Sequence, residues 1–332
     1  MDQADRPRMA ARIIGAFAVA AAYAVGCYFL VDWARPDSGM VMVSFALVQP
    51  AAICAFLCYL CDPLARRTKR FYGMVPVVCL VGMIVISAVL LQEGVVCILM
   101  LAVPWLISGE IGAMVTYRMR RRDPEADPSS VFLSPGLLVL PLAMMPIEAM
   151  ITPPARDYTV TRTILIDAPA ETIWPLMQGI PDVARGEGRW NLSQDVIGIP
   201  RPTGAWLEGS GIGAIRHARW DHGIAFREIV TQWQPGRRIG WTFDFAGSEG
   251  WEFTDRHLRP DSEYMQIRKG GYELIPQGNG KHLLKLETSY TARTHFNPYA
   301  ALWGEFFLGD LENNILTAIR NRAEAVRTSP PA

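Results

Sequence analysis

Long apolar runs fill the first half of the chain and have the length and spacing of membrane-spanning helices. A hydrocarbon core about 30 Å thick requires roughly 20 apolar residues in helical form. Five segments approach this length, at residues 11–31, 39–61, 72–91, 94–117 and 131–151. The fifth contains three prolines and Glu148, which a membrane helix tolerates when its neighbours satisfy the freed carbonyl groups. The pattern predicts a transmembrane anchor of about five spans over residues 1–151.

Basic residues gather at alternate ends of these segments. The amino terminus carries Arg6, Arg8 and Arg12, residues 65–70 read ARRTKR, and residues 118–122 read RMRRR. The two other connections carry almost no positive charge, and positively charged connections stay in the cytoplasm. We therefore expect an integral inner (cytoplasmic) membrane protein with a cytoplasmic amino terminus. If the fifth segment spans, the second half of the chain lies on the extracytoplasmic side.

The pattern changes at Tyr158, where apolar and polar residues begin to alternate. Residues 158–167 (YTVTRTILID) have the period of a half-buried strand. Pro169 then falls in a first helical turn, where its missing N–H costs nothing. We expect a strand followed by a helix, and then an irregular region over residues 179–211, which are rich in glycine and proline.

Further alternating runs follow, separated by short turn sequences. They lie at residues 213–220, 224–233, 239–245, 264–276 and 281–294, and the chain ends in a helical pattern that begins at Asn297 and Pro298. That helix would be about 45 Å long at 1.5 Å per residue. An antiparallel sheet cannot bury its concave face alone, so we expect the long helix to lie across it and to leave an apolar cavity.

Composition limits the chemistry that this chain can perform. Its 32 basic and 32 acidic residues balance, so we expect no nucleic-acid partner. All six cysteines lie in the first half and all five histidines in the second, so the spacing of Cys54, Cys58 and Cys61 predicts packing and not a metal site. His217 and His222 lack a third ligand, and no GxSxG motif is present. We expect no metal, no cofactor and no assignable catalytic residue.

The second half resembles a known superfamily. The segments ILIDAPAETIWPLM, GIGAIRH, FREIVTQWQPGRRIGWTF and GYELIPQGNGKHLLKLETSY, with the closing RAEAV helix, resemble the START-like (SRPBCC) helix-grip superfamily in its polyketide cyclase/dehydrase and lipid-transport branch. Residues 93–100 (EGVVCILM) resemble bacterial proteins that place a multi-span anchor before such a domain. The expected fold class is an N-terminal all-α transmembrane bundle plus a C-terminal α+β helix-grip domain. The expected boundaries are a linker at 152–157, the domain at 158–327 and a disordered tail at 328–332.

The resemblance implies a hydrophobic ligand, such as a lipid, sterol or polyketide, in the cavity of this domain. Strand and helix positions supply the candidates for its wall, which are Trp206, Arg216, Trp220, Glu228, Trp241, Tyr272, Glu287, Tyr290, Trp303 and Phe306. If Arg216 and Glu228 face inward, they must pair or meet a polar ligand head, because an unpaired buried charge is costly.

Three functions remain open from the sequence. A membrane-anchored binding or carrier module would take a hydrophobic small molecule or lipid from the bilayer. A cyclase- or dehydratase-type enzyme would move protons on a bound polyketide-like substrate and would need a titrating group on the cavity wall. A structural partner of a membrane complex is the third hypothesis. We favour binding, because no constellation of residues identifies a catalytic group.

Overall fold

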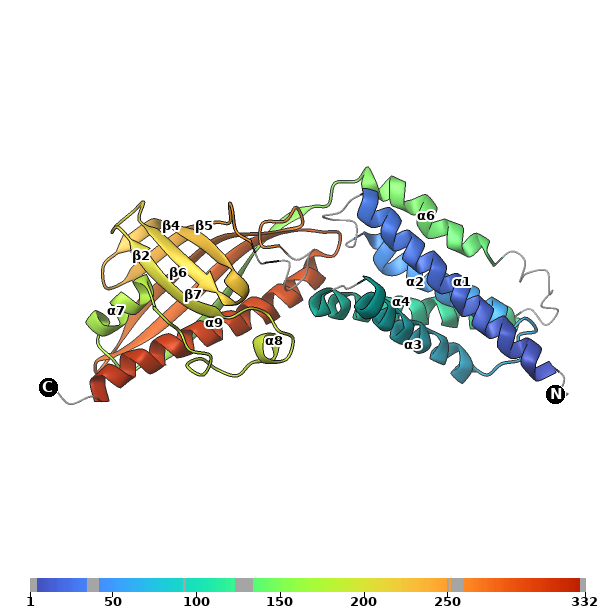
Figure 1. Cartoon of the computed structure of the whole chain (residues 1–332), viewed down its shortest axis with the longest axis horizontal. Helices are drawn as coiled ribbons and strands as arrows, with labels where there is room; N and C mark the ends of the chain where they lie inside the picture. Colours follow the sequence, from blue (N-terminus) through green and yellow to red (C-terminus); the bar gives the residue numbers. More distant parts are fainter. Residues whose placement is uncertain are drawn as a thin grey trace. The chain divides into compact units, whose positions relative to one another are not determined.

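The computed structural model describes residues 5–34, 42–91, 94–122, 134–249, 251 and 259–328. The chain divides into two compact units, Met1–Pro153 and Pro154–Ala332. The first unit is helical, and the second combines an antiparallel sheet with helices (Figure 1).

Four helical stretches of the first unit are long and apolar enough to cross a membrane. They lie within α1 (Asp5–Ala34), a π-helical turn (Ser44–Val48) continuous with α2 (Gln49–Cys61), α3 (Lys69–Ile86) with a π-helical turn at Ser87–Leu91, and α4 (Val95–Arg122). Of the residues in Ser44–Cys61, 67% are buried, against 11% of the residues in the apolar 18-residue part of Lys69–Leu91. The second stretch is therefore the centre of the bundle, and the third faces outward.

The fifth span predicted at residues 131–151 is wrong in its length. The helix there, α6 (Gly136–Ala149), has 14 residues, or about 20 Å at 1.5 Å per residue, which is short of a hydrocarbon core. Pro135 precedes its first residue. It ends before Pro153 and Pro154, and a proline disfavours helical geometry in the residue before it. Residues 131–133 lie outside the described part of the chain, as does Glu93.

Helix α6 runs along the length of the bundle. Leu138 packs in a cluster that includes Cys61, at the end where α2 finishes. Met145 packs in a second cluster that includes Phe45, at the end where α2 begins. Beyond it, the Glu148 carboxylate accepts hydrogen bonds from the Ser44 amide at 2.8 Å and the Ser44 hydroxyl at 2.7 Å. The carboxyl end of α6 is thus held where the second apolar stretch begins.

The second unit contains one seven-stranded sheet, antiparallel throughout, in the order β1-β7-β6-β5-β4-β3-β2. The strands are β1 (Ala155–Ile166), β2 (Pro202–Glu208), β3 (Ile215–Trp220), β4 (Ala225–Gln234), β5 (Arg238–Asp244), β6 (Met265–Gly278) and β7 (Lys281–Arg293). The helices are α7 (Ala170–Gln178), α8 (Leu192–Asp195) and α9 (Asn297–Thr328). Residues 329–332 of the expected tail lie outside the described residues.

Two elements, α8 and β2, lie in the region 179–211 that the sequence predicted to be irregular. Strand β2 begins at Pro202 and contains Gly204, and both residues are uncommon inside a sheet. The strand pairs only with β3 and forms one edge of the sheet, where proline and glycine are tolerated. The composition that suggested a loop therefore belongs to an edge strand.

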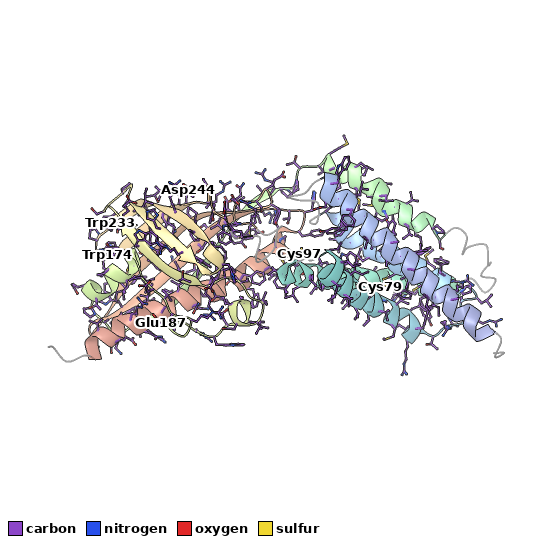
Figure 2. All side chains as sticks on the ribbon, in the orientation of Figure 1. Cys79, Cys97, Trp174, Glu187, Trp233 and Asp244 are labelled. Carbon is purple, nitrogen blue, oxygen red and sulfur yellow. The ribbon has the colours of Figure 1, made fainter. Side chains whose placement is uncertain are left out.

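Helix α9 packs across one face of the sheet, against β1 and β7 (Figure 1). Leu316 and Ile319 of α9 belong to the same core as Ile239 and Leu284 of the sheet. At the edge of this core, Trp174 of α7 meets Trp233 of β4 edge to face, with ring centroids 5.2 Å apart (Figure 2). A long carboxyl-terminal helix on one face of an antiparallel sheet is the helix-grip arrangement.

Candidate functional site

The strand register sorts the charged and aromatic residues onto two faces of the sheet. Directly paired residues share a face. Arg216 pairs with Glu228, and Glu228 pairs with Phe243 of the core, so this row faces α9. Trp206 pairs with His217, and His217 pairs with Arg227, so the neighbouring row lies on the opposite face.

Arg216 and Glu228 form a buried ion pair on the face that packs against α9. Their side chains are 7% and 5% exposed, and the Arg216 Nε also donates to the Gln178 carbonyl at the end of α7. The guanidinium lies 5.2 Å from the ring centroid of Trp241 and 6.0 Å from that of Tyr272. Burial lowers the pKa of Arg216, but Glu228 and Tyr272 raise it by more, so it stands above its ordinary value. Each charge therefore has a partner.

Glu312 projects from α9 into the same interior. It is 2% exposed, and neither of its carboxylate oxygens makes a hydrogen bond of good geometry with a described residue, although the Thr288 hydroxyl is close enough to act on it. Burial raises the pKa of Glu312 to about 8, and the hydroxyl of Thr288 on β7 acts in the opposite direction. A carboxyl with a pKa of about 8 is largely protonated at neutral pH and can both donate and accept a hydrogen bond.

The Trp241 indole is a second polar group whose Nε1 has no hydrogen-bond partner in the described chain. Its ring lies over Gly270, where an added Cβ would stand 2.8 Å from Nε1. Gly270 of β6 is paired with Trp241 of β5 on one side and with Thr288 of β7 on the other, and Thr288 faces Glu312. The indole N–H and the carboxyl therefore approach neighbouring positions in this row of paired residues. Adjacent strands lie about 5 Å apart.

Aromatic rings surround this polar pair. The Trp241 and Tyr272 centroids are 5.4 Å apart, and burial raises the pKa of Tyr272 to about 12. Beyond them lies an apolar cluster built mainly from aromatic residues, which are Trp220, Phe226, Phe243, Phe245 and Trp251. The interior of the helix-grip unit therefore combines a large aromatic surface with a small set of polar groups, which is the composition of small-molecule sites.

Two of the candidate residues from the sequence lie on the other face of the sheet. Trp206 is 41% exposed and stacks on His217, with 4.8 Å between ring centroids. Glu287 lies between the inward-facing positions Leu286 and Thr288, and its carboxylate is 2.6 Å from the Lys285 ammonium. Neither side chain joins Arg216 and Glu228.

Three further candidates lie toward the amino-terminal part of α9. Tyr290 is buried, stacks on Tyr158 at 5.6 Å, and packs its hydroxyl against Gly304 of α9. Trp303 and Phe306 are partly buried and contact each other edge to face at 6.1 Å. The arrangement therefore brings together Arg216, Glu228, Trp241 and Tyr272, with Trp220 in the adjoining aromatic cluster.

Glu312 and Thr288 were not among the residues that the sequence indicated. Glu312 lies four positions before Leu316 and seven before Ile319, both fully buried, so it occupies the same buried stripe of α9 as these apolar residues. An acid at such a position was the available signal. Among the described residues, no group of three histidine, cysteine, aspartate or glutamate side chains could hold a metal ion.

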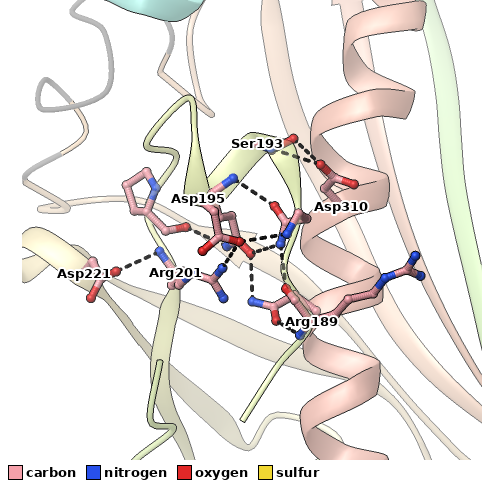
Figure 3. A network of polar contacts seen from close by, with 10 residues as sticks. Arg189, Ser193, Asp195, Arg201, Asp221 and Asp310 are labelled. Carbon is pink, nitrogen blue, oxygen red and sulfur yellow. Dashed lines mark hydrogen bonds and ion pairs between the residues drawn. The ribbon is translucent and has the colours of Figure 1, made fainter. Parts of the chain in front are cut away.

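A polar network holds α8 against α9 beside this interior (Figure 3). The Asp310 carboxylate accepts from the Ser193 amide at 3.1 Å and the Ser193 hydroxyl at 2.6 Å. The Asn314 amide donates to the Gln194 side chain at 2.7 Å. This network fixes the irregular segment between α7 and β2 onto the long helix.

No family model matches the sequence, and no curated protein does. Solved structures do match it. Norcoclaurine synthase from Thalictrum flavum, in complex with dopamine and hydroxybenzaldehyde, is 13% identical, covers 53% of this chain and 91% of its own, and has a TM-score of 0.34. A START superfamily protein from Mycobacterium smegmatis is 13% identical, with coverages of 51% and 98% and a TM-score of 0.34.

The Zhui aromatase/cyclase from Streptomyces sp. R1128 is 12% identical, with coverages of 53% of this chain and 100% of its own and a TM-score of 0.34. The chain is similar to START-type and cyclase-type proteins over about half of its length.

Proposed function

We propose that this chain is a membrane-anchored protein that holds a hydrophobic small molecule between its sheet and α9. The observation that carries the proposal is a pair of buried polar groups: the Trp241 Nε1 has no hydrogen-bond partner among the described residues, and the Glu312 carboxyl has only the Thr288 hydroxyl near it, without a hydrogen bond of good geometry. A buried polar group without a partner costs free energy. Such groups in an aromatic interior are favoured where a ligand supplies the missing hydrogen bonds. The second half of the chain would then be the binding domain and the first half its anchor.

The proposal is tested by identifying what the protein carries. The full chain, purified in mild detergent, should release an apolar molecule of defined mass when it is denatured and analysed by mass spectrometry. Thr288→Phe places a ring beside Glu312 and should remove that molecule. The matched control Thr291→Phe lies in the same strand on the opposite face and should retain it. Failure to find any molecule other than detergent or bulk lipid in the wild-type protein would overturn the proposal.

A second candidate function is an acid–base enzyme of the cyclase or dehydratase type. The specific observation in its favour is Glu312, because a carboxyl with a pKa of about 8 can give and take a proton near neutral pH. The two functions differ in the fate of the ligand. A carrier releases the molecule that it bound, whereas a dehydratase releases one that has lost water. Comparing the mass and the chromatographic retention of the molecule before and after incubation separates them, because loss of water changes the mass and cyclisation alone changes only the retention.

We further propose that the second unit lies on the extracytoplasmic side of the membrane. The basic segments at residues 65–70 and 118–122 lie at one end of the bundle, where the Arg120 guanidinium donates to the Pro63 carbonyl at 2.7 Å. Glu148 and Ser44 meet at the other end. Because basic connections stay in the cytoplasm, the end that holds Glu148 would face outward. This orientation requires α6 to cross from one end of the bundle to the other, although its 14 residues are short of a hydrocarbon core. The chain continues from there into β1.

A further inference from the structure

The charged groups around Glu312, on α9 and on both faces of the neighbouring strands, are already paired. Arg162 of β1 donates to Glu305 of α9 at 2.6 Å, and Glu287 of β7 contacts Lys285 at 2.6 Å. Deeper in the sheet, Arg216 is bonded to Glu228 and lies near Tyr272. No cation that the structure describes around Glu312 is left for an anionic ligand, so an anion in this interior would have no charged partner.

The two orphaned groups have a definite hydrogen-bonding character. An indole N–H can only donate, and a protonated carboxyl donates through its hydroxyl. Trp241 lies over Gly270, and Gly270 is paired with Thr288 beside Glu312. Two donors therefore converge on one region of an apolar interior, which is an arrangement suited to a single oxygen with two lone pairs.

We infer that the ligand carries an uncharged hydrogen-bond acceptor, a ketone or similar carbonyl oxygen, and that Glu312 and Trp241 both donate hydrogen bonds to it. Ligands whose polar group is a carboxylate or a phosphate are excluded. This inference rests on the proposed function and names the chemical class of its ligand. It assigns Glu312 the role of a ligand-binding residue, a role that the protonated form alone can fill.

The inference predicts how binding depends on pH. Ionisation of Glu312 removes its donor and places a negative charge beside the carbonyl oxygen, so affinity should fall as the pH rises through about 8. Among the charged groups around this carboxyl, Arg162 lowers its pKa, while Glu305 and, from the opposite face of β7, Glu287 raise it. Glu312→Gln keeps a neutral donor at every pH and should bind without this dependence. Glu312→Leu should bind weakly throughout.

The experiment uses the full chain in lipid nanodiscs, with empty nanodiscs subtracted, and titrates three probes of matched length by calorimetry. The probes are dodecan-2-one, dodecanoate and dodecane. Wild-type protein should bind the ketone about tenfold more tightly at about pH 6 than at about pH 9.5, which corresponds to the loss of one good hydrogen bond. It should bind dodecanoate at least about tenfold more weakly than the ketone at either pH. The control Glu273→Gln, on the opposite face of β6, should behave as wild type.

The outcomes separate the inference from the proposed function. Equal binding of all three probes, with no effect of Glu312→Gln, would leave a hydrophobic binding protein and overturn the carbonyl assignment. Tighter binding of dodecanoate than of the ketone would also overturn it. Failure of every probe to bind, together with the absence of a co-purified molecule, would overturn the proposed function itself.

Discussion

Arg216 and Glu228 illustrate the energetics of a charge pair enclosed by a sheet and a helix. Removing one member of a buried pair leaves the other charge without compensation, and this costs about 3–5 kcal/mol. We therefore expect Arg216→Met to lower the free energy of unfolding by about this amount. Thermal unfolding followed by tryptophan fluorescence measures it, because eight of the ten tryptophans lie in the second unit.

The exposed pair Arg227–Asp244 is the matched control for this change, because it also joins paired positions of neighbouring strands but lies on the opposite face of the sheet, with half of the Arg227 side chain in solvent. Arg227→Met should cost less than about 1 kcal/mol. The double variant Arg216→Met with Glu228→Leu should recover most of the lost stability. Equal costs for the buried and the exposed pair would show that Arg216 is not enclosed.

Glu312 makes the stability of the second unit depend on pH. Its pKa is about 8 in the folded protein against an ordinary 4.5, so in this interval the folded state binds a proton that the unfolded state releases. Stability therefore falls as the pH rises from about 4.5 to about 8, by at most about 5 kcal/mol. Melting temperatures measured across this range should decline for the wild type and stay flatter for Glu312→Gln. Parallel curves for the two proteins would contradict the assignment.

At the scale of elements, α9 organises the second unit by anchoring both the sheet and α8. The sheet approaches α9 at its glycines, because Tyr290 rests on Gly304 and Arg162 rests on Gly309. The segment between α7 and β2 is attached through the polar network around Asp310. A helix that touches β1, β7 and α8 at once closes the interior from two sides.

We expect Asp310→Ala to free α8 without unfolding the sheet. The variant loses two hydrogen bonds from Ser193 to a carboxylate, each worth about 1.5–3 kcal/mol at most when fully formed. Hydrogen exchange should accelerate in residues 190–200 and stay unchanged in β6 and β7. The control is Asp261→Ala, which removes an exposed carboxylate whose oxygen lies 3.3 Å from the Arg259 Nε. This variant should not change hydrogen exchange near α8. A uniform rise in exchange over the whole sheet would contradict this local role.

At the scale of the whole molecule, the direction of α6 determines which end of the bundle leads to the second unit. A reporter enzyme that works only outside the cytoplasm, fused after Ala332, should be active. The same reporter fused after Arg122 should be inactive, because that basic end is expected to stay in the cytoplasm. Activity of the second fusion and not of the first would reverse the proposed orientation.

Much of the fold could be predicted from local pattern. The six strands other than β2 and the helix α9 follow from alternation and helical spacing within single segments. The prediction failed where a local signal was ambiguous, since Pro202 and Gly204 suggest a loop and occur in an edge strand. It failed again at α6, where apolar composition suggested a full span and prolines set a shorter helix.

The candidate site depended on information that no single segment contains. Adjacent residues of a strand point to opposite faces of the sheet. Only the pairing of the strands therefore shows which residues share a face. The pairing of β2 with β3 places Trp206, and the pairing of β6 with β7 places Glu287, on the face opposite to Arg216 and Glu228. The sequence by itself determined the strands, the long helix and the apolar segments, because these follow from the periodicity of neighbouring residues. The tertiary structure alone decided that Glu312 lies opposite Thr288 beneath an aromatic surface, because burial and partnership arise from long-range contacts.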